Sequence, residues 1–315
     1  MIEIFLTVLP VFLLLGIGYA SARTGYLSAT IADPLNAYTV KLAVPVLLFR
    51  ALYRLDLSTA FHPPLLASFY AGALASFAAG IVAARLVWKR RPGEAVAVGF
   101  CALFSNTLLL GVPIVERAFG EAALTPAFGI VALHAPALYT IGIIVMELSR
   151  RDGRSLGQTL RTAAVTVLAN TLMIGILAGA ALNLAGIRLP EPAMAAIDMV
   201  AATAIPVALI GIGASLTRYR LKAELSESLM VSALSLFVHP IIAFVLARHV
   251  FALPPEFVRV AVIMAAMPPG MNVYIFAVMY DRAVALAASA VLVATALSVA
   301  TVTLWLFVLR VALAG

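Results

Sequence analysis

Charged residues and cysteine are both scarce in this 315-residue chain. Only 11% of the residues are charged, compared with about 25% in a typical soluble domain. Because 64% are hydrophobic, a soluble fold could not keep so much apolar surface away from water, which argues against soluble enzymes and nucleic-acid-binding proteins. The single cysteine, Cys101, excludes an intramolecular disulfide and a cysteine-based metal cluster.

The signatures of membrane-embedded enzymes are missing as well. The chain holds no His-Glu-x-x-His pattern and no Gly-x-Ser-x-Gly elbow, and its four histidines are scattered. The sequence therefore predicts no catalytic residue, no metal site and no cofactor. A receptor, a structural protein, a lipid scramblase or a membrane-embedded transferase are the other classes to consider, and a saturable flux without chemical change would separate a transporter from all of them.

Long apolar runs are what the chain has in abundance. The mean hydropathy is +1.10, and a helix needs about 20 apolar residues to cross a bilayer core about 30 Å thick. We therefore predict an all-α membrane protein with ten transmembrane helices. The candidate spans are residues 2–22, 32–52, 64–87, 95–118, 126–148, 163–186, 195–216, 228–249, 257–280 and 284–310.

The net charge of +7 is distributed unevenly between the two ends of these spans. Thirteen Lys and Arg residues lie in or beside the odd-numbered loops, seven lie at the opposite ends, and Lys41 lies inside span two. Since cytoplasmic loops carry an excess of Lys and Arg, the odd-numbered loops are predicted to be cytoplasmic and both termini extracytoplasmic. The thirteen are Arg23, Arg85, Lys89, Arg90, Arg91, Arg150, Arg151, Arg154, Arg161, Arg218, Arg220, Lys222 and Arg282.

The two halves of the chain resemble each other. Pro45 and Pro206 lie 161 positions apart in the similar tetrapeptides Ala-Val-Pro-Val and Ala-Ile-Pro-Val. The segments after spans four and nine, which begin at Gly120 and Asp281, show the same offset. Five spans per copy is an odd number, so the second copy must be inverted in the membrane. We predict two repeats, residues 1–155 and 156–315, an arrangement typical of transporters.

Spans four and nine each contain a helix-breaking segment at mid-length. A proline there removes a backbone hydrogen bond, and unwound backbone must be buried in protein or line a cavity. Two breaks entering from opposite sides would cross near the midplane, where backbone amides and two asparagines could hold an anion. Alternatively, the prolines only kink their helices. The residues predicted to bind substrate at the crossing are Ser105, Asn106, Thr107, Pro113, Pro268, Pro269, Gly270, Met271 and Asn272.

Four segments resemble the auxin efflux carrier family, which includes plant PIN exporters and bacterial malate or malonate permeases. Residues 105–113 with 118–120 are similar to the fourth-helix motif of that family, and residues 267–270 with Phe276, Ala277 and Tyr280 to its ninth-helix motif. Residues 35–49 and 10–25 resemble the second-helix and first-helix motifs. The long cytoplasmic loop of the best-known plant members is absent, which places the chain nearer the compact bacterial type.

The resemblance implies a fold related to bile-acid and sodium/proton transporters. Spans one, two, six and seven would form a scaffold, while spans three to five and eight to ten would form a transport unit that moves in an elevator-like manner. Asn106 would match the site asparagine of the family, and Pro45 and Val46 would line the scaffold side of the pocket. A homodimer through the scaffold and a bacterial-type inner membrane are implied as well.

The function that these features indicate is secondary transport of a small organic anion, a carboxylate similar to malate, malonate or auxin. No Asp or Glu lies within residues 103–113 or 266–275, where related cation-coupled carriers place carboxylates. This absence favours transport without sodium. The alternative is a sodium- or proton-coupled symporter of a carboxylate or a bile-acid-like substrate.

Ionisable residues inside the predicted spans have two interpretations each. Lys41 could present a cation to the anion pathway, or its side chain could extend to the membrane interface. His239, directly before Pro240, could relay protons near neutral pH, or it could bond to a carbonyl freed by the proline kink. His134, close to Pro136, is a weaker candidate for a functional role.

Overall fold

The regular secondary structure of the protein is helical. The computed structural model describes residues 2–56, 60–150, 157–158, 161, 165, 171–218 and 224–313. Its first-half elements are α1 (Ile2–Arg23), α2 (Ala29–Tyr38), η1 (Thr39–Ala43), α3 (Val44–Arg54), α5 (Pro63–Leu86), α6 (Pro92–Leu103), η2 (Thr107–Gly111), α7 (Val112–Phe119), η3 (Glu121–Ala123) and α8 (Leu124–Arg150). Its second-half elements are α10 (Thr171–Leu184), α11 (Glu191–Leu216), α12 (Leu225–Ala233), η4 (Leu234–Val238), α13 (His239–Val245), η5 (Leu246–Val250), α14 (Pro255–Ala265), α15 (Met271–Tyr280) and α16 (Val284–Ala312).

Seven helical segments in the described part of the chain are long and apolar enough to cross a membrane. An all-α integral membrane protein is thereby confirmed, whereas the total of ten spans stays a prediction. Predicted spans four and nine are interrupted, between α6 and η2 and between α14 and α15. Predicted span six is described at residue 165 and from α10 onward. The seven segments are Ile2–Arg23, Thr30–Arg54, Pro63–Leu86, Glu121–Ser149, Glu191–Leu216, Leu225–Val250 and Val284–Ala312.

Some sequence-based expectations fall on parts of the chain that the structure does not cover. The predicted boundary between the two repeats, at residues 155 and 156, lies outside the described residues. The same is true of Arg151, Arg154, Arg220 and Lys222, four of the thirteen basic residues assigned to the cytoplasmic loops.

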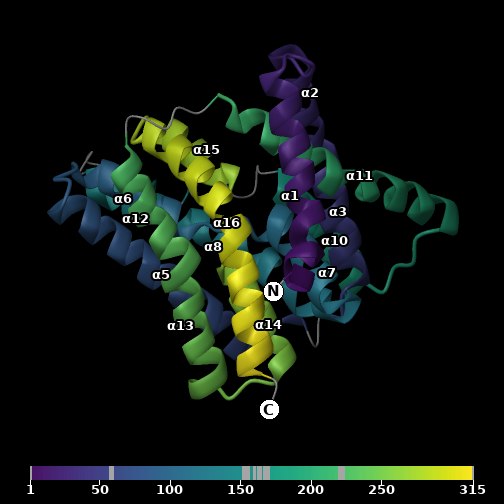
Figure 1. Cartoon of the computed structure of the whole chain (residues 1–315). Helices are drawn as coiled ribbons and strands as arrows, with labels where there is room; N and C mark the ends of the chain where they lie inside the picture. Colours follow the sequence, from purple (N-terminus) through teal and green to yellow (C-terminus); the bar gives the residue numbers. More distant parts are fainter. Residues whose placement is uncertain are drawn as a thin grey trace.

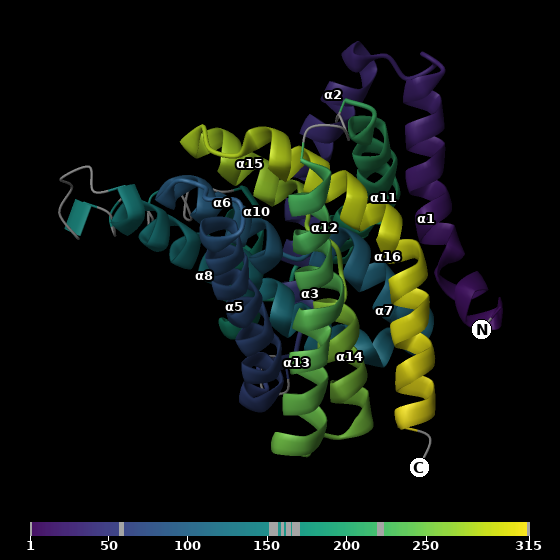
Figure 2. The same cartoon turned by 60° about the vertical axis from the view of Figure 1, so that its left-hand side comes forward.

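The helices pack in two groups. In the first, α1 packs along α11 and α3 packs along α10, while α11 also contacts α2 and α3. In the second, α5 packs against α6, α13 and α14, α8 packs against α6, and α12 packs against α16. Figure 1 shows the first group on the right and α5, α6, α12 and α13 on the left, and Figure 2 shows α13, α14 and α16 side by side. The short helix α7 contacts both groups, through α1 on one side and through α8 and α14 on the other.

Glycines allow α3 and α10 to approach each other closely. Gly175 lies against the backbone carbonyl of Pro45, and Gly179 lies against the backbone of Phe49. A Cβ atom at either glycine would overlap these backbone atoms. Small residues at such crossings are typical of helix packing in membranes, where close contact between backbones replaces the hydrophobic driving force. The contact holds the carbonyl of Pro45 against α10.

Three prolines lie at the second position of a helix that directly follows a π-helical turn. They are Pro45 after η1, Pro113 after η2 and Pro240 after η4. Because a proline ring clashes with the preceding turn and supplies no N–H, a wider turn accommodates it without ending the helix. Pro113 is predicted from the sequence to lie in the break of span four. The chain instead unwinds upstream, at residues 104–106, and Pro113 lies in continuous helix.

An ion pair ties the loop between α5 and α6 to the start of α12. Arg90 Nη2 lies 2.8 Å from Glu227 Oε2 and 2.9 Å from Glu224 Oε1, and the Glu227 side chain is only 2% exposed. The hydrogen bond from Arg90 to Glu227 raises the pKa of the guanidinium above its usual value, and the nearby Glu224 carboxylate adds to this effect. The guanidinium of Arg90 is therefore charged at any physiological pH.

Candidate functional site

The two interrupted spans meet at their breaks. The N–H of Asn106 donates to the carbonyl of Pro268 at 2.8 Å, and the N–H of Gly270 donates to the carbonyl of Phe104 at 3.3 Å. These bonds form a short antiparallel bridge between Ser105 and Pro269. Backbone groups that the broken helices leave without helical partners are thus satisfied by each other, which is how unwound backbone is tolerated inside a membrane protein.

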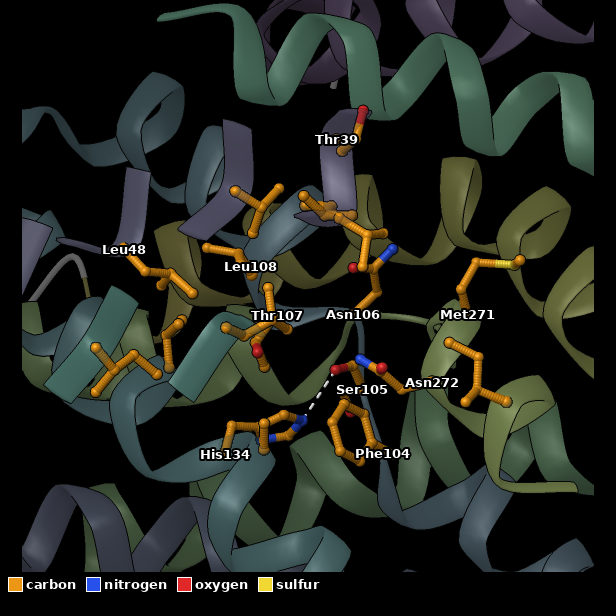
Figure 3. Close-up of a pocket in the computed structure, with 18 residues that line it drawn as sticks. Thr39, Leu48, Phe104, Ser105, Asn106, Thr107, Leu108, His134, Met271 and Asn272 are labelled. Atoms are coloured by element: carbon orange, nitrogen blue, oxygen red, sulfur yellow. Dashed lines mark hydrogen bonds between the residues drawn. The ribbon is translucent and has the colours of Figure 1, made fainter. Parts of the chain in front are cut away.

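A cavity of about 110 Å³ lies against the paired breaks. Its wall is mainly apolar and comes from η1, α3, η2, α8, α10 and α15 (Figure 3). The polar side chains that line it are Thr39, Ser105, Asn106, Thr107, His134 and Asn272. A small, mostly apolar space with a few polar groups is typical of a site that binds one small molecule.

Asn106 presents an unused carboxamide to this cavity. Its side chain is half-buried, and no group in the described chain forms a hydrogen bond with it. Figure 3 shows the carboxamide on the side of the break that faces Thr39, away from His134. Gly270 lies directly beside it, where an added Cβ would be 3.4 Å from the Cβ of Asn106. Both the NH₂ group and the oxygen of Asn106 are therefore available to a ligand.

Asn272 contributes a second amide group with a defined orientation. The hydroxyl of Tyr139 donates to Asn272 Oδ1 at 3.1 Å, which occupies the oxygen and leaves the NH₂ group as a donor. Asn272 is the second residue of α15, and Thr107 is the first residue of η2. Two helix N-termini, each the positive end of a helix dipole, therefore border the cavity. An anion suits this arrangement better than a cation does.

Two buried histidines, His134 and His239, contact the broken segment at Ser105. His134 Nε2 donates to the carbonyl of Ser105 at 3.0 Å, as Figure 3 shows. His239 Nε2 donates to the carbonyl of Phe69 at 2.9 Å, and its Nδ1 lies 3.4 Å from the hydroxyl oxygen of Ser105. His239 does not line the cavity. Its geometry favours a structural role, although it bonds to a carbonyl of α5 rather than of its own kinked helix, and a proton relay stays a prediction.

The predicted site residues fall in several places. Ser105, Asn106, Thr107, Met271 and Asn272 line the cavity. Pro268, Pro269 and Gly270 form the other side of the paired break. Pro113 lines a second cavity, while Pro45 and Val46 are half-buried and outside the lining of the first.

The face of span two that lines the cavity differs from the predicted one, and a substrate contact of Pro45 and Val46 stays a prediction. Val40, Val44 and Leu48 line it, in place of Pro45 and Val46. These three are four residues apart, so they share one helical face, and this spacing was the available signal. The contribution of Leu172 and Ile176 from α10 was also missed. Their span carries no polar marker that would have singled them out.

Replacing Lys41 by methionine is expected to leave ligand affinity within about twofold of the wild-type value. Lys41 is exposed, in the π-helical turn η1, and it does not line the cavity. The cation is therefore not positioned to contact an anion bound there. The substrate affinity of the purified Lys41→Met variant tests this expectation. A loss of affinity of about tenfold or more would show that Lys41 does contact the anion.

A membrane protein with two broken helices that pair around a small cavity has the architecture of a carrier. The comparison with known families agrees: the family model described as "Membrane transport protein" matches residues 3–306. The chain belongs to this family of transporters, the auxin efflux carriers, and is not an enzyme. The resemblance drawn from the motifs is thus confirmed.

Individual relatives match the chain along almost its whole length. A protein of Rhizobium meliloti (strain 1021) named "Putative malonate transporter" is 26% identical over 310 residues, which is 98% of this chain and 97% of the relative. A protein of Methanothermobacter thermautotrophicus named "Uncharacterized transporter" is 26% identical over 308 residues, 96% of this chain and 97% of the relative. This chain is similar to both.

Proposed function

We propose that this protein is a secondary transporter of a small organic anion, and that the carboxylate binds in the cavity between the paired breaks. The single observation that carries the proposal is the composition of that cavity. The free carboxamide of Asn106, the NH₂ group of Asn272 and two helix N-termini surround it. The breaks contain no acidic residue that would repel an anion or hold a sodium ion. The name of the Rhizobium relative supports a malonate-like substrate.

The proposed mechanism is alternating access of the elevator type, with ten helices in two inverted repeats. The 161-residue offset of Pro45 and Pro206 supports the repeats, and the pairing of two broken helices supports a central substrate site. We assign α1, α2, α3, α10 and α11 to the scaffold and the second group of helices to the moving unit. The family resemblance supports a homodimer through the scaffold and an inner-membrane location.

The cavity is open, in this proposal, toward the cytoplasm. Thr39 lies near the start of predicted span two and Ile275 near the end of span nine, so both lie toward the loops that carry Arg23 and Arg282. Those loops are predicted to be cytoplasmic because of their basic residues. The structure therefore corresponds to the state that faces the cytoplasm.

Transport in proteoliposomes tests the function directly. Malonate, malate, an indole carboxylate and a bile acid are offered at acidic and neutral pH, with and without sodium. Charge movement and counterflow of radiolabelled acid are both recorded, because an electroneutral exchange moves no net charge. Saturable transport of one acid without sodium is the expected result. Sodium-dependent uptake would favour the symporter alternative, and the absence of both current and counterflow for every acid would contradict the proposal.

A further inference from the structure

A second cavity lies beside α7, the helix that follows the break in span four. It measures about 340 Å³ and is lined by residues of α1, α3, α7, α8 and α11. Residues 107–109 line the first cavity, whereas Val112 and Pro113 line the second. Likewise, Leu48 lines the first and Leu47 the second. The start of α7 and the middle of α3 therefore lie between the two cavities.

The charged side chains at the second cavity are Arg50, Glu116 and Arg117. The residues that α1, α8 and α11 contribute to its wall are uncharged. Arg117 is partly engaged, because its Nε donates to the carbonyl of Thr7 at 2.8 Å. Glu116 is exposed, so its charge is well solvated. The groups that line the cavity carry a net positive charge.

Arg50 forms a long ion pair with Asp198 beside this cavity. Arg50 Nε lies 3.5 Å from Asp198 Oδ1, while Arg54 Nη2 donates to the other carboxylate oxygen, Oδ2, at 2.8 Å. Asp198 Oδ1 is buried and accepts no hydrogen bond, and no hydrogen bond of the Arg50 guanidinium is found in the described chain. Asp198 is thus hydrogen-bonded to Arg54 and ion-paired with Arg50 at a longer distance. Apart from this ion pair through Nε, the N–H groups of the Arg50 guanidinium can donate to another acceptor.

We propose that the second cavity is a binding vestibule for the transported carboxylate, with Arg50 as its anion-binding residue. The guanidinium offers a carboxylate two parallel N–H···O bonds, which is the preferred geometry for this pair. Asp198 is the competing carboxylate, and an incoming substrate takes its place beside Arg50. The vestibule serves the face of the membrane opposite to the first cavity. This inference rests on the proposed function, because it assigns a second binding site to the same substrate.

The test compares two arginines that both flank Asp198, of which only Arg50 lines the cavity. The half-saturating concentration of malonate, or of the acid that the wild type carries, is measured at each face in proteoliposomes of known orientation with the opposite face saturated. Arg50→Gln should raise this concentration about tenfold or more at the Arg50 face and less than about twofold at the other face. Arg50→Lys keeps the charge but loses the paired geometry, so its effect should be intermediate. Arg54→Gln, the comparison variant, keeps Arg50 but frees Asp198 to pair with it, so its effect at the Arg50 face should stay well below that of Arg50→Gln, and the other face should change by less than about twofold.

A gain-of-affinity variant separates this proposal from simple structural damage. Asp198→Asn removes the competing carboxylate, so the half-saturating concentration at the Arg50 face should fall. Equal effects of Arg50→Gln and Arg54→Gln, or an unchanged value in Arg50→Gln with wild-type transport intact, would overturn the vestibule alone. Absence of carboxylate transport by the wild type would overturn the proposed function and the vestibule with it.

Discussion

Replacing Asn106 by alanine is expected to weaken carboxylate binding about tenfold or more, because the variant loses hydrogen bonds to a charged ligand. The fold should be unaffected, since the side chain of Asn106 makes no hydrogen bond to the described chain. Asn106→Asp keeps the shape but introduces a negative charge, so an anion should lose still more affinity. Binding to the purified variants, measured by calorimetry beside thermal unfolding, checks both expectations.

Asn183→Ala is the matched control for this result. The NH₂ group of Asn183 donates to the carbonyls of Leu52 and Leu55, each at 2.7 Å, and it does not line the cavity. Its loss should therefore lower stability and leave affinity unchanged, the reverse of the Asn106 result. If Asn106→Ala binds the acid as tightly as the wild type does, the substrate binds elsewhere. Tighter binding by Asn106→Asp would point to a cationic substrate.

Replacing His134 by phenylalanine is expected to lower the free energy of unfolding by about 0.5–1.5 kcal/mol, because the buried carbonyl of Ser105 loses one of its two hydrogen bonds and keeps the one from the N–H of Thr107. The ring contacts of His134 with Phe69 and Phe104 should survive in the variant. The carbonyl of Ser105, however, loses the donor at 3.0 Å that holds the unwound segment in place. Transport should fall with stability, since this segment carries Asn106. Unfolding in a denaturing detergent and counterflow of the transported acid measure the two effects.

Ser105→Ala distinguishes the backbone contact from the side-chain contact at the same residue. It removes only the hydroxyl that lies 3.4 Å from His239 Nδ1, a long bond, and leaves the carbonyl bonded to His134. The loss of stability should be below about 1 kcal/mol. His134→Gln can still donate an N–H and should restore part of what phenylalanine loses. Equal stability of His134→Phe and wild type would show that the carbonyl does not depend on this donor.

Predicting the membrane helices and the two breaks was possible from local sequence. Apolar runs of span length identify membrane helices because the bilayer imposes one length and one polarity on every span. An asparagine close to a proline and a glycine in such a run marks a break: Asn106 precedes Gly111 and Pro113, and Asn272 follows Pro269 and Gly270. These features depend on residues close in sequence, so they can be read without knowing which helices are neighbours.

Which residues face the cavity was decided by packing between distant segments. The π-helical turn η1 and the close contact of Gly175 with Pro45 leave Val44 and Leu48 on the cavity and hold Pro45 against α10. Two supporting contacts, His134 with Ser105 and His239 with Phe69, join residues 29 and 170 positions apart. No local pattern encodes them.

The sequence by itself determined a helical membrane carrier with two interrupted spans, since hydropathy and backbone chemistry act within a few residues. Only the tertiary structure decided that the breaks satisfy each other's backbone groups and that Lys41 lies outside the cavity. It also decided that Arg50 lies beside a carboxylate already held by Arg54. Such contacts depend on the relative rotation and depth of whole helices, which follow from the packing of their side chains rather than from any single span.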